Sequence, residues 1–366
     1  MGMREELIED IRISYRIIEG YEENIQLSPD PKEVERSRQE IPRQWDLIRG
    51  WLVRLSGLGG AVPDDIAELA KSLPEGPPPA GQPGPVPPEV GAPRAADGPV
   101  SCGPEEIARL LALAEPPARI WWKKAEMEMV LVPAGPFTMG SAEDAPHALA
   151  DEKPAHPVFM SAYYIGRYPV TNQQYALFID ATDHRIPYVD PLEDRSAQPY
   201  NWDQEFKVSP VGNEDHPVVL VSWDDATAYC QWAGLYLPTE AEWEKAARGT
   251  DGRTYPWGNE WDPARCNWDK GGTSPVSHYS PAGDSPYGCA DIIGNAWEWC
   301  ADWYGRDYYR NGPPRDPPGP TTGQNRVMRG GAFLYDAWNL RCAYRDGAPP
   351  ARRLVTMGFR CAISGR

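Results

Sequence analysis

A run rich in proline, glycine and alanine divides this chain into two parts. Residues 74–103 contain the stretch PEGPPPAGQPGPVPPEVGAP, which has too few large apolar side chains to bury a core and favours extended polyproline conformations. A segment of this kind ends one folded unit and precedes another. We interpret it as a linker, in preference to a set of PxxP ligands for aromatic grooves.

The part before the linker, residues 1–73, is predicted to be a small all-α module. Its first stretch carries apolar residues at helical spacing between charged ones. A second helix is expected to begin at Asp30-Pro31, a capping residue followed by proline at the first helical position, and a short third helix follows Pro63. This module is a candidate for recruiting a protein partner.

The part after the linker begins with one more expected short helix and its connection, residues 104–119. From residue 120 the sequence changes to short strand-like runs, many turns and frequent tryptophans. Residues 120–366 are therefore predicted to form a second domain, whose aromatic rings bury large areas while their polar tips need hydrogen-bond partners.

Charge and hydropathy exclude several classes of partner. The formal net charge is -17, so a nucleic-acid backbone or an anionic membrane surface would repel the chain. The charged N-terminus has no apolar core of the kind a signal peptide needs, and no run approaches the roughly 20 apolar residues that span a bilayer. We expect a cytoplasmic protein with no nucleic-acid partner and no membrane insertion.

The cysteines favour neither a zinc site nor a disulfide scaffold. They are odd in number, widely spaced and never arranged as CxxC, so we expect buried thiols. The seven are Cys102, Cys230, Cys266, Cys289, Cys300, Cys342 and Cys361.

Two helices can be predicted inside the second domain. In VSWDDATAYCQWAG, Asp224 or Ser222 caps a helix that Gly234 ends in the left-handed conformation. In LPTEAEWEKAARG, Thr239 and Glu242 have the spacing of a capping box. The carboxylates of this second helix are interpreted as favourable charges at a helix N-terminus and not as catalytic groups.

The second domain contains a series of sequence blocks in a fixed order. They are MVLVPAGPFTMGS at 129–141, YYIGRYPVTNQQYALF at 163–178, HPVVLVSWDDATAYCQWAG at 216–234, LPTEAEWEKAARG at 237–249, YPWGN at 255–259, IIGNAWEWCADW at 292–303, and RVMRGGAF...RCAYR...GFRCA at the end. Together these blocks resemble the formylglycine-generating-enzyme, or sulfatase-modifying-factor, family. The resemblance covers nearly all of residues 129–362 and implies an α+β, C-type lectin-like domain with small antiparallel sheets, two packed helices and much irregular structure. Secreted members of this family pair the cysteines that match Cys230 and Cys361, so the resemblance implies that these two lie close in space.

One loop is a candidate metal site. In the family, the positions matching Asp291, Gly294, Ala296 and Glu298 bind calcium, through two side chains and two main-chain carbonyls. An all-oxygen set of this kind suits a hard cation. The other interpretation is a buried turn in which Glu298 accepts backbone hydrogen bonds. Both stay open from the sequence, and no cofactor is required otherwise.

The family's oxidase residues are missing from this sequence. The resemblance places its first copper-binding cysteine at Tyr335, its second near Ala337, and its assisting serine at Ala332. Cu(I) requires soft thiolate ligands. A related branch holds iron through a histidine-rich helical domain, but no histidine precedes His147 here. The sequence-based expectation is that the chain is not an enzyme, with a metal-dependent oxidase kept as an alternative.

The final block, residues 329–362, resembles the variable region of diversity-generating-retroelement target proteins. A framework of Arg, Gly, aromatic and Cys residues is interrupted by three unpatterned triplets, where adenine-rich codons would fall in that class. Framework positions Arg329, Arg341 and Arg360 are expected to bond backbone carbonyls. The predicted ligand-binding residues are Leu334, Tyr335, Asp336, Trp338, Tyr344, Asp346, Gly347, Ala348, Leu354, Val355 and Thr356.

Binding of this kind needs a few aromatic anchors among adaptable small or polar groups on a rigid frame. The leading hypothesis is thus a receptor or display protein for an unknown protein or small-molecule ligand. An association of this protein with phage is compatible with the hypothesis. The alternative from another class is a cytoplasmic adaptor or sensor of a signalling or defence system, which recruits its partner through residues 1–73.

Overall fold

The computed structural model describes residues 63, 66, 67, 71 and 99–365. The chain divides into two compact units, Met1–Pro93 and Arg94–Arg366. The first two helices expected in the N-terminal module and most of the proline-rich linker lie outside the described residues. Every helix within the described part is too short or too polar to cross a lipid bilayer.

The second unit starts earlier than the sequence indicates. Residues up to 103 were assigned to the linker, but Val100–Cys102 form strand β1, which pairs in parallel with β2. Only Cys102 of this strand is buried, as expected of a short strand at a sheet edge. The short helix expected next is present as α4 (Pro104–Leu111).

The larger sheet has five strands in the order β1-β2-β3-β6-β11. All pairs beyond β1 and β2 are antiparallel. The sequence YYIG of β6 is buried at every position, because this strand has a neighbour on each side and packs on both faces. The strands are β2 (Arg119–Trp122), β3 (Met127–Val132), β6 (Tyr163–Gly166) and β11 (Ala362–Ser364).

A four-stranded sheet, ordered β10-β7-β8-β9, carries most of the final block. Its register places Met357 opposite Trp297, and Glu298 opposite Arg329. The strands β4 and β5 form a separate pair. The bounds are β4 (Gly135–Met139), β5 (His156–Met160), β7 (Trp297–Trp303), β8 (Arg326–Arg329), β9 (Arg345–Ala348) and β10 (Met357–Gly358).

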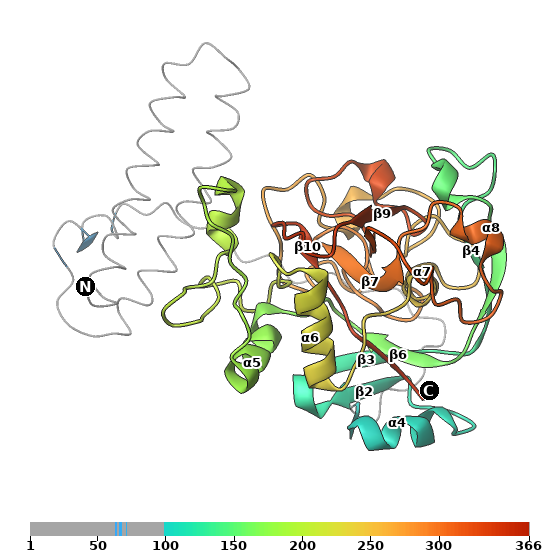
Figure 1. The fold of residues 1–366 in the computed structure, drawn as a ribbon, viewed down its shortest axis with the longest axis horizontal. Coiled ribbons are helices and arrows are strands. Elements are labelled where there is room, and N and C mark those ends of the chain that lie inside the picture. Colours follow the sequence, from blue (N-terminus) through green and yellow to red (C-terminus); the bar gives the residue numbers. More distant parts are fainter. Residues whose placement is uncertain (1–62, 64–65, 68–70, 72–98, 366) are drawn as a thin grey trace, which may run out of the picture. The chain divides into compact units, whose positions relative to one another are not determined.

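The two helices predicted from capping signals are confirmed. The Ser222 side chain accepts from the Asp225 amide at the start of α6, Gly234 ends that helix at φ 74, and the Thr239 and Glu242 capping box starts α7. In Figure 1, α5 and α6 lie next to each other. The α-helices are α5 (Asn172–Thr182), α6 (Trp223–Ala233), α7 (Glu240–Arg248) and α8 (Tyr308–Asn311), and the 3-10 helices are η1 (Lys123–Ala125), η2 (Ala150–Glu152), η3 (Arg195–Tyr200), η4 (Pro263–Arg265) and η5 (Ala337–Asn339).

The carboxylates of α7 do more than favour a helix N-terminus. Arg329 Nη2 lies 2.6 Å from Glu244 Oε2, and Arg345 Nη2 lies 2.6 Å from Glu240 Oε2, all four side chains being buried. Arg329 also donates to the carbonyls of residues 342 and 343, as expected of a framework arginine. The interpretation of Glu240 and Glu244 from helix charge alone was therefore incomplete, because their partners are more than 80 residues away in sequence.

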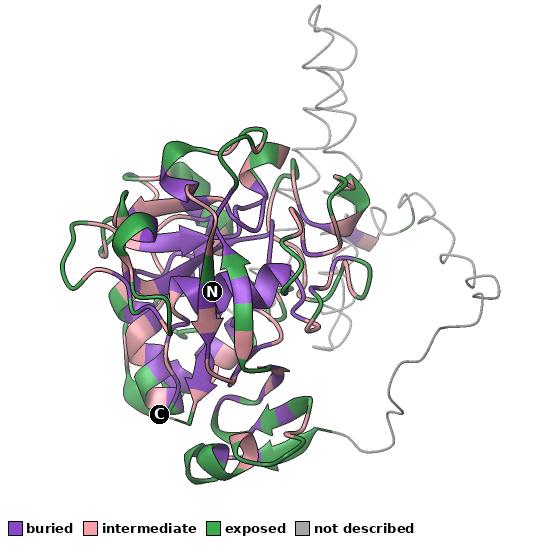
Figure 2. Cartoon of the chain, turned by 90° about the vertical axis from the view of Figure 1, so that its right-hand side faces the viewer, coloured by how far each residue is buried: buried purple, intermediate pink, exposed green. Residues whose placement is uncertain are grey.

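The thiols are buried as predicted. All seven cysteines are free and inaccessible. Cys230 Sγ and Cys361 Sγ lie 3.5 Å apart, which confirms that they are close in space. Figure 2 shows that the buried segments gather in the interior of this unit and that the exposed ones, in loops, helices and edge strands, lie at its periphery. The mixture of small sheets, few helices and long irregular stretches confirms the α+β class.

Candidate functional site

Trp297, at the start of β7, lies at the centre of the predicted ligand-binding residues. Its ring contacts Tyr335 edge-on, with 5.2 Å between centroids, and Tyr344 at 5.9 Å. Its amide donates to the Thr356 carbonyl at 2.8 Å. Three separate parts of the final block therefore contact this one residue, two of them at its indole ring and one at its main chain.

The Trp297 side chain is 1% exposed, and its Nε1–H has no hydrogen-bond partner among the described residues. An indole nitrogen only donates, and leaving a buried donor unpaired costs about 1–3 kcal/mol. The half-buried rings of Tyr335 and Tyr344 cover this indole. The arrangement offers large aromatic contact area beside a donor that favours a hydrogen-bond acceptor.

Residues 334–339 form a partly exposed segment of the block, with a buried side chain at each end. Phe333 is 2% exposed and Leu340 is fully buried, whereas Leu334 is 62% and Trp338 53% exposed. The Trp338 ring stacks on His147 at a centroid distance of 5.8 Å. Leu334 and Trp338 therefore present two large apolar side chains to the solvent within one short segment.

Arg341 holds the C-terminal end of segment 334–339 in place. It forms a two-pronged ion pair with Glu152, at 2.7 Å for each N–O contact, and donates to the carbonyls of Trp338 and His147. Burial alone would raise the pKa of Glu152, but the guanidinium holds that pKa below its ordinary value. The expected framework role of Arg341 thus includes a buried carboxylate partner.

The structure distributes the predicted ligand residues unevenly. Leu334, Asp336 and Trp338 are exposed, and Tyr335, Tyr344, Asp346, Gly347 and Leu354 are half-buried. Ala348, Val355 and Thr356 are buried, because they pack beneath the surface in β9 or just before β10. The surface that a ligand can reach is therefore narrower than the three triplets.

In the candidate calcium loop, the carboxylate of Asp291 is free of ion pairs within residues 99–365, whereas that of Glu298 is paired with Arg360. Both oxygens of Glu298 are held at 2.6 Å by Arg360, and Trp243 Nε1 donates to one of them. Asp291 accepts the Ser277 amide and forms no ion pair within residues 99–365. Glu298 does not fit a calcium ligand while Arg360 occupies both of its oxygens. Calcium binding through Asp291 and main-chain carbonyls stays a prediction.

No copper centre can be built at the positions that the resemblance indicates. Tyr335 and Ala337 supply no thiolate, and Ala332 is buried without a hydroxyl. Within the described ranges, no three His, Cys, Asp or Glu side chains gather as a metal-binding group. These positions do not fit copper held by two thiolates.

Two features of the site were missed from the sequence. Trp297 lies inside a recognised block, and its hydrophobic context indicated only core. Residues 183–207 line two cavities together with Arg353, but this irregular stretch has neither periodicity nor a motif. The role of Trp297 could have been recognised only from its place at the start of β7, the strand that pairs with β8 and β10 of the final block.

Solved structures support the fold. The chain resembles PvdO from Pseudomonas aeruginosa with a TM-score of 0.57 and 26% identity, covering 68% of this chain and 99% of that one. Treponema denticola variable protein 1 superposes with a TM-score of 0.52 and 24% identity, over 67% of this chain and 97% of that one. These likenesses confirm the predicted C-type lectin-like fold.

Sequence relatives correct the expectation that the chain is not an enzyme. A protein of Streptomyces coelicolor named formylglycine-generating enzyme is 37% identical over 279 residues, covering 64% of this chain and 88% of the relative. Kinship at this level points to catalysis as a function open to this chain. The expectation was wrong because it used the loss of one ligand pair to exclude every reaction, whereas a family fold can host other reacting groups.

The match to the family itself spans most of the chain. Residues 121–364 match the domain described as Sulfatase-modifying factor enzyme 1-like. This range contains the two capped helices, the strand of Trp297 and the final block. The chain therefore belongs to the sulfatase-modifying factor enzyme 1-like family.

Proposed function

We propose that this chain binds a ligand through the face formed by Tyr335, Trp338 and Tyr344, and that residues 329–362 are the target of a diversity-generating retroelement. The observation that carries the proposal is the arrangement of residues 334–339. Leu334 and Trp338 are exposed between two buried anchors, and the indole donor of Trp297, which Tyr335 contacts, has no hydrogen-bond partner in the described part of the chain.

The physical support is pre-organisation. Arg341 and its buried ion pair fix the segment before any ligand arrives, so little conformational entropy is lost on binding. Tyrosine and tryptophan supply contact area with only two side-chain torsions each. The neighbouring Leu334 and Asp336 can differ between versions of the protein without disturbing the core.

The DNA that flanks the gene tests the diversification. An imperfect copy of the stretch encoding residues 329–362, next to a reverse-transcriptase gene, is the expected finding. Differences between the two copies should fall at adenines of the template and within the codons for 334–336 in particular. Flanking DNA with neither copy nor reverse transcriptase would remove this part of the proposal.

A second candidate function is catalysis at the same face, and the relative named formylglycine-generating enzyme favours it. Its test is oxidation of a cysteine-containing peptide, followed by mass spectrometry, with copper or iron added to the full chain. Turnover that disappears in Trp297→Phe, while the fold is retained, would favour catalysis over simple binding. Unchanged peptide under all metal conditions would count against it.

A further inference from the structure

Two adjoining cavities lie between residues 183–207 and the segment 351–354. Their volumes are about 460 Å³ and about 440 Å³, and Tyr188 and Arg353 line both of them. Each is within the range of small-molecule sites, about 300–1,000 Å³. Because they share two lining residues, we treat them as one cleft with two ends, which we call the charge-divided cleft.

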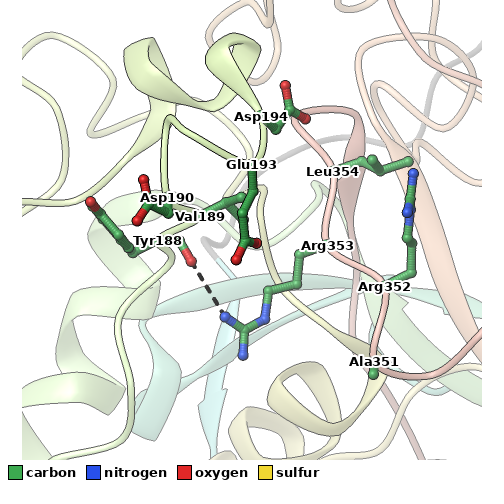
Figure 3. A pocket seen from close by; sticks show the side chains of 9 residues that line it. All are labelled: Tyr188, Val189, Asp190, Glu193, Asp194, Ala351, Arg352, Arg353 and Leu354. Atoms are coloured by element: carbon green, nitrogen blue, oxygen red, sulfur yellow. Dashed lines mark hydrogen bonds between the residues drawn. The ribbon is translucent and has the colours of Figure 1, made fainter.

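One end of the charge-divided cleft is acidic. Asp190, Glu193 and Asp194 line it, and none of them forms an ion pair within the described residues. Asp190 accepts the Leu192 amide and Asp194 accepts the Ser196 amide, so Glu193 is the carboxylate of the three without such a bond in this part of the chain. Figure 3 shows that the Glu193 side chain projects into the space between the two walls, on the side of Arg353. Arg352 on the opposite wall also has no ion-pair partner within this part of the chain. The acidic end therefore carries an excess of negative charge.

The other end is basic, and its cations are held in place by one buried carboxylate. The Asp225 side chain is 4% exposed. Arg185 Nη2 donates to it at 2.8 Å, His184 Nε2 lies 2.8 Å away, and Arg353 Nε lies 3.5 Å away. Two guanidinium groups share this one carboxylate, while Lys207 pairs with Asp183. The basic end keeps at least one net positive charge.

Both guanidinium groups are oriented and have donors to spare. Arg353 Nη1 donates to the Tyr188 carbonyl at 3.3 Å, drawn as the dashed line in Figure 3. Arg185 uses Nε and Nη2 on Asp225 and Ser222, and its Nη1 makes no hydrogen bond with any described residue. A guanidinium group has five N–H donors in a fixed plane, which suits a carboxylate.

We infer that the charge-divided cleft binds a small zwitterionic molecule, with its carboxylate against Arg185 and Arg353 and its amine against Glu193. A ligand with only negative charge would be repelled by the acidic end, and a purely cationic ligand by the basic end. Only a ligand with both charges separated along its length satisfies both ends. This inference does not rest on the proposed function, because Leu354 is the only predicted ligand residue that lines the cleft.

The test is isothermal titration calorimetry of the full chain with glycine, γ-aminobutyrate and ε-aminocaproate, which differ in the distance between the charges. Acetate, butyrate and caproate, together with ethylamine, butylamine and hexylamine, serve as the chain-length-matched analogues of the three that each carry one charge. At least one amino carboxylate should bind, and its single-charge analogues should bind at least about tenfold more weakly, the effect of about 1.4 kcal/mol. If none of the three binds, or if caproate binds as well as ε-aminocaproate, the inference is wrong.

Matched variants locate the binding. Arg353→Gln and Glu193→Gln should each weaken it about tenfold, and Glu193 is exposed, so its substitution leaves the fold intact. Arg195→Gln and Glu205→Gln remove exposed charges that do not line the cleft, and they should change nothing. Tyr335→Ala should also leave this binding unchanged, which separates the cleft from the proposed face. Full affinity in Glu193→Gln would overturn the assignment.

Discussion

Glu298 and Arg360 form a fully buried ion pair in which each carboxylate oxygen accepts one guanidinium N–H at 2.6 Å. The same guanidinium group donates to the carbonyls of Gly166 and Ala290. This pair therefore joins the four-stranded sheet, the end of β6 and the last segment of the chain.

Glu298→Gln should destabilise the domain by about 3–5 kcal/mol, because Arg360 would keep its charge without a partner in a fully buried environment. Urea unfolding followed by tryptophan fluorescence measures the change. The matched control is Asp262→Asn, whose pair with Arg265 is about 40% exposed and should contribute at most about 1 kcal/mol. Similar losses in both variants would contradict the structural role assigned to Glu298.

Truncation of two tryptophans of the site should change the free energy of unfolding by very different amounts. Trp297→Ala removes a buried ring and should cost about 3–5 kcal/mol of unfolding free energy. Trp338→Ala removes a ring that is 53% exposed and should change stability by less than about 1 kcal/mol. Thermal and urea unfolding of both proteins provide the comparison, and a large loss in Trp338→Ala would show that this residue belongs to the core.

Asp302 makes stability depend on pH. Burial raises the pKa of its carboxyl group to about 8 in the folded domain, whereas an unfolded aspartate has a pKa near about 3.9. Between these values the folded state binds a proton that the unfolded state has lost. Stability therefore falls as the pH rises from about 4 to about 8, by at most about 1.4 kcal/mol per pH unit.

Asp302→Asn should flatten this part of the profile. Urea unfolding at several pH values across the window measures it, with the exposed Asp269→Asn as the control for the loss of one charge. A profile for Asp302→Asn that runs parallel to that of the wild type would show that other groups set the pH dependence.

Calcium is predicted to act through Asp291. Millimolar Ca²⁺ should raise the Tm by a few degrees, because a ligand that binds only the folded state stabilises it by mass action. Asp291→Asn should lose this shift, and Mg²⁺ should give a smaller one, since it dehydrates reluctantly. Equal Tm values in Ca²⁺ and in a chelator would rule out calcium binding at Asp291 and favour the other interpretation of this loop, a buried turn.

The parts of the fold that the sequence predicts are those governed by local rules. Ser222, Gly234, Thr239 and Glu242 act within one or two helical turns, so their capping roles can be recognised from spacing alone. The buried carboxylate Glu152 carries no such signal. Its partner Arg341 lies 189 residues away, and only the tertiary fold brings them together.

The candidate site stays a prediction, and the sequence indicates only part of its geometry. Recurring framework residues located the block and identified Tyr335, Trp338 and Tyr344 as its aromatic members. The burial of Val355 and Thr356 could not be inferred, because the triplet that contains them looks as unpatterned as the exposed one at 334–336. Whether a short segment faces solvent depends on what packs over it.

The stretch between Phe333 and Leu340 has an evolutionary consequence. Its two ends are buried, whereas Leu334 and Asp336 between them are exposed. Random changes at 334 and 336 should therefore carry small folding penalties on average, whereas changes at the two ends should be eliminated by selection. A population of such genes can then accumulate sequence variety at these two codons without first acquiring compensating mutations elsewhere in the domain.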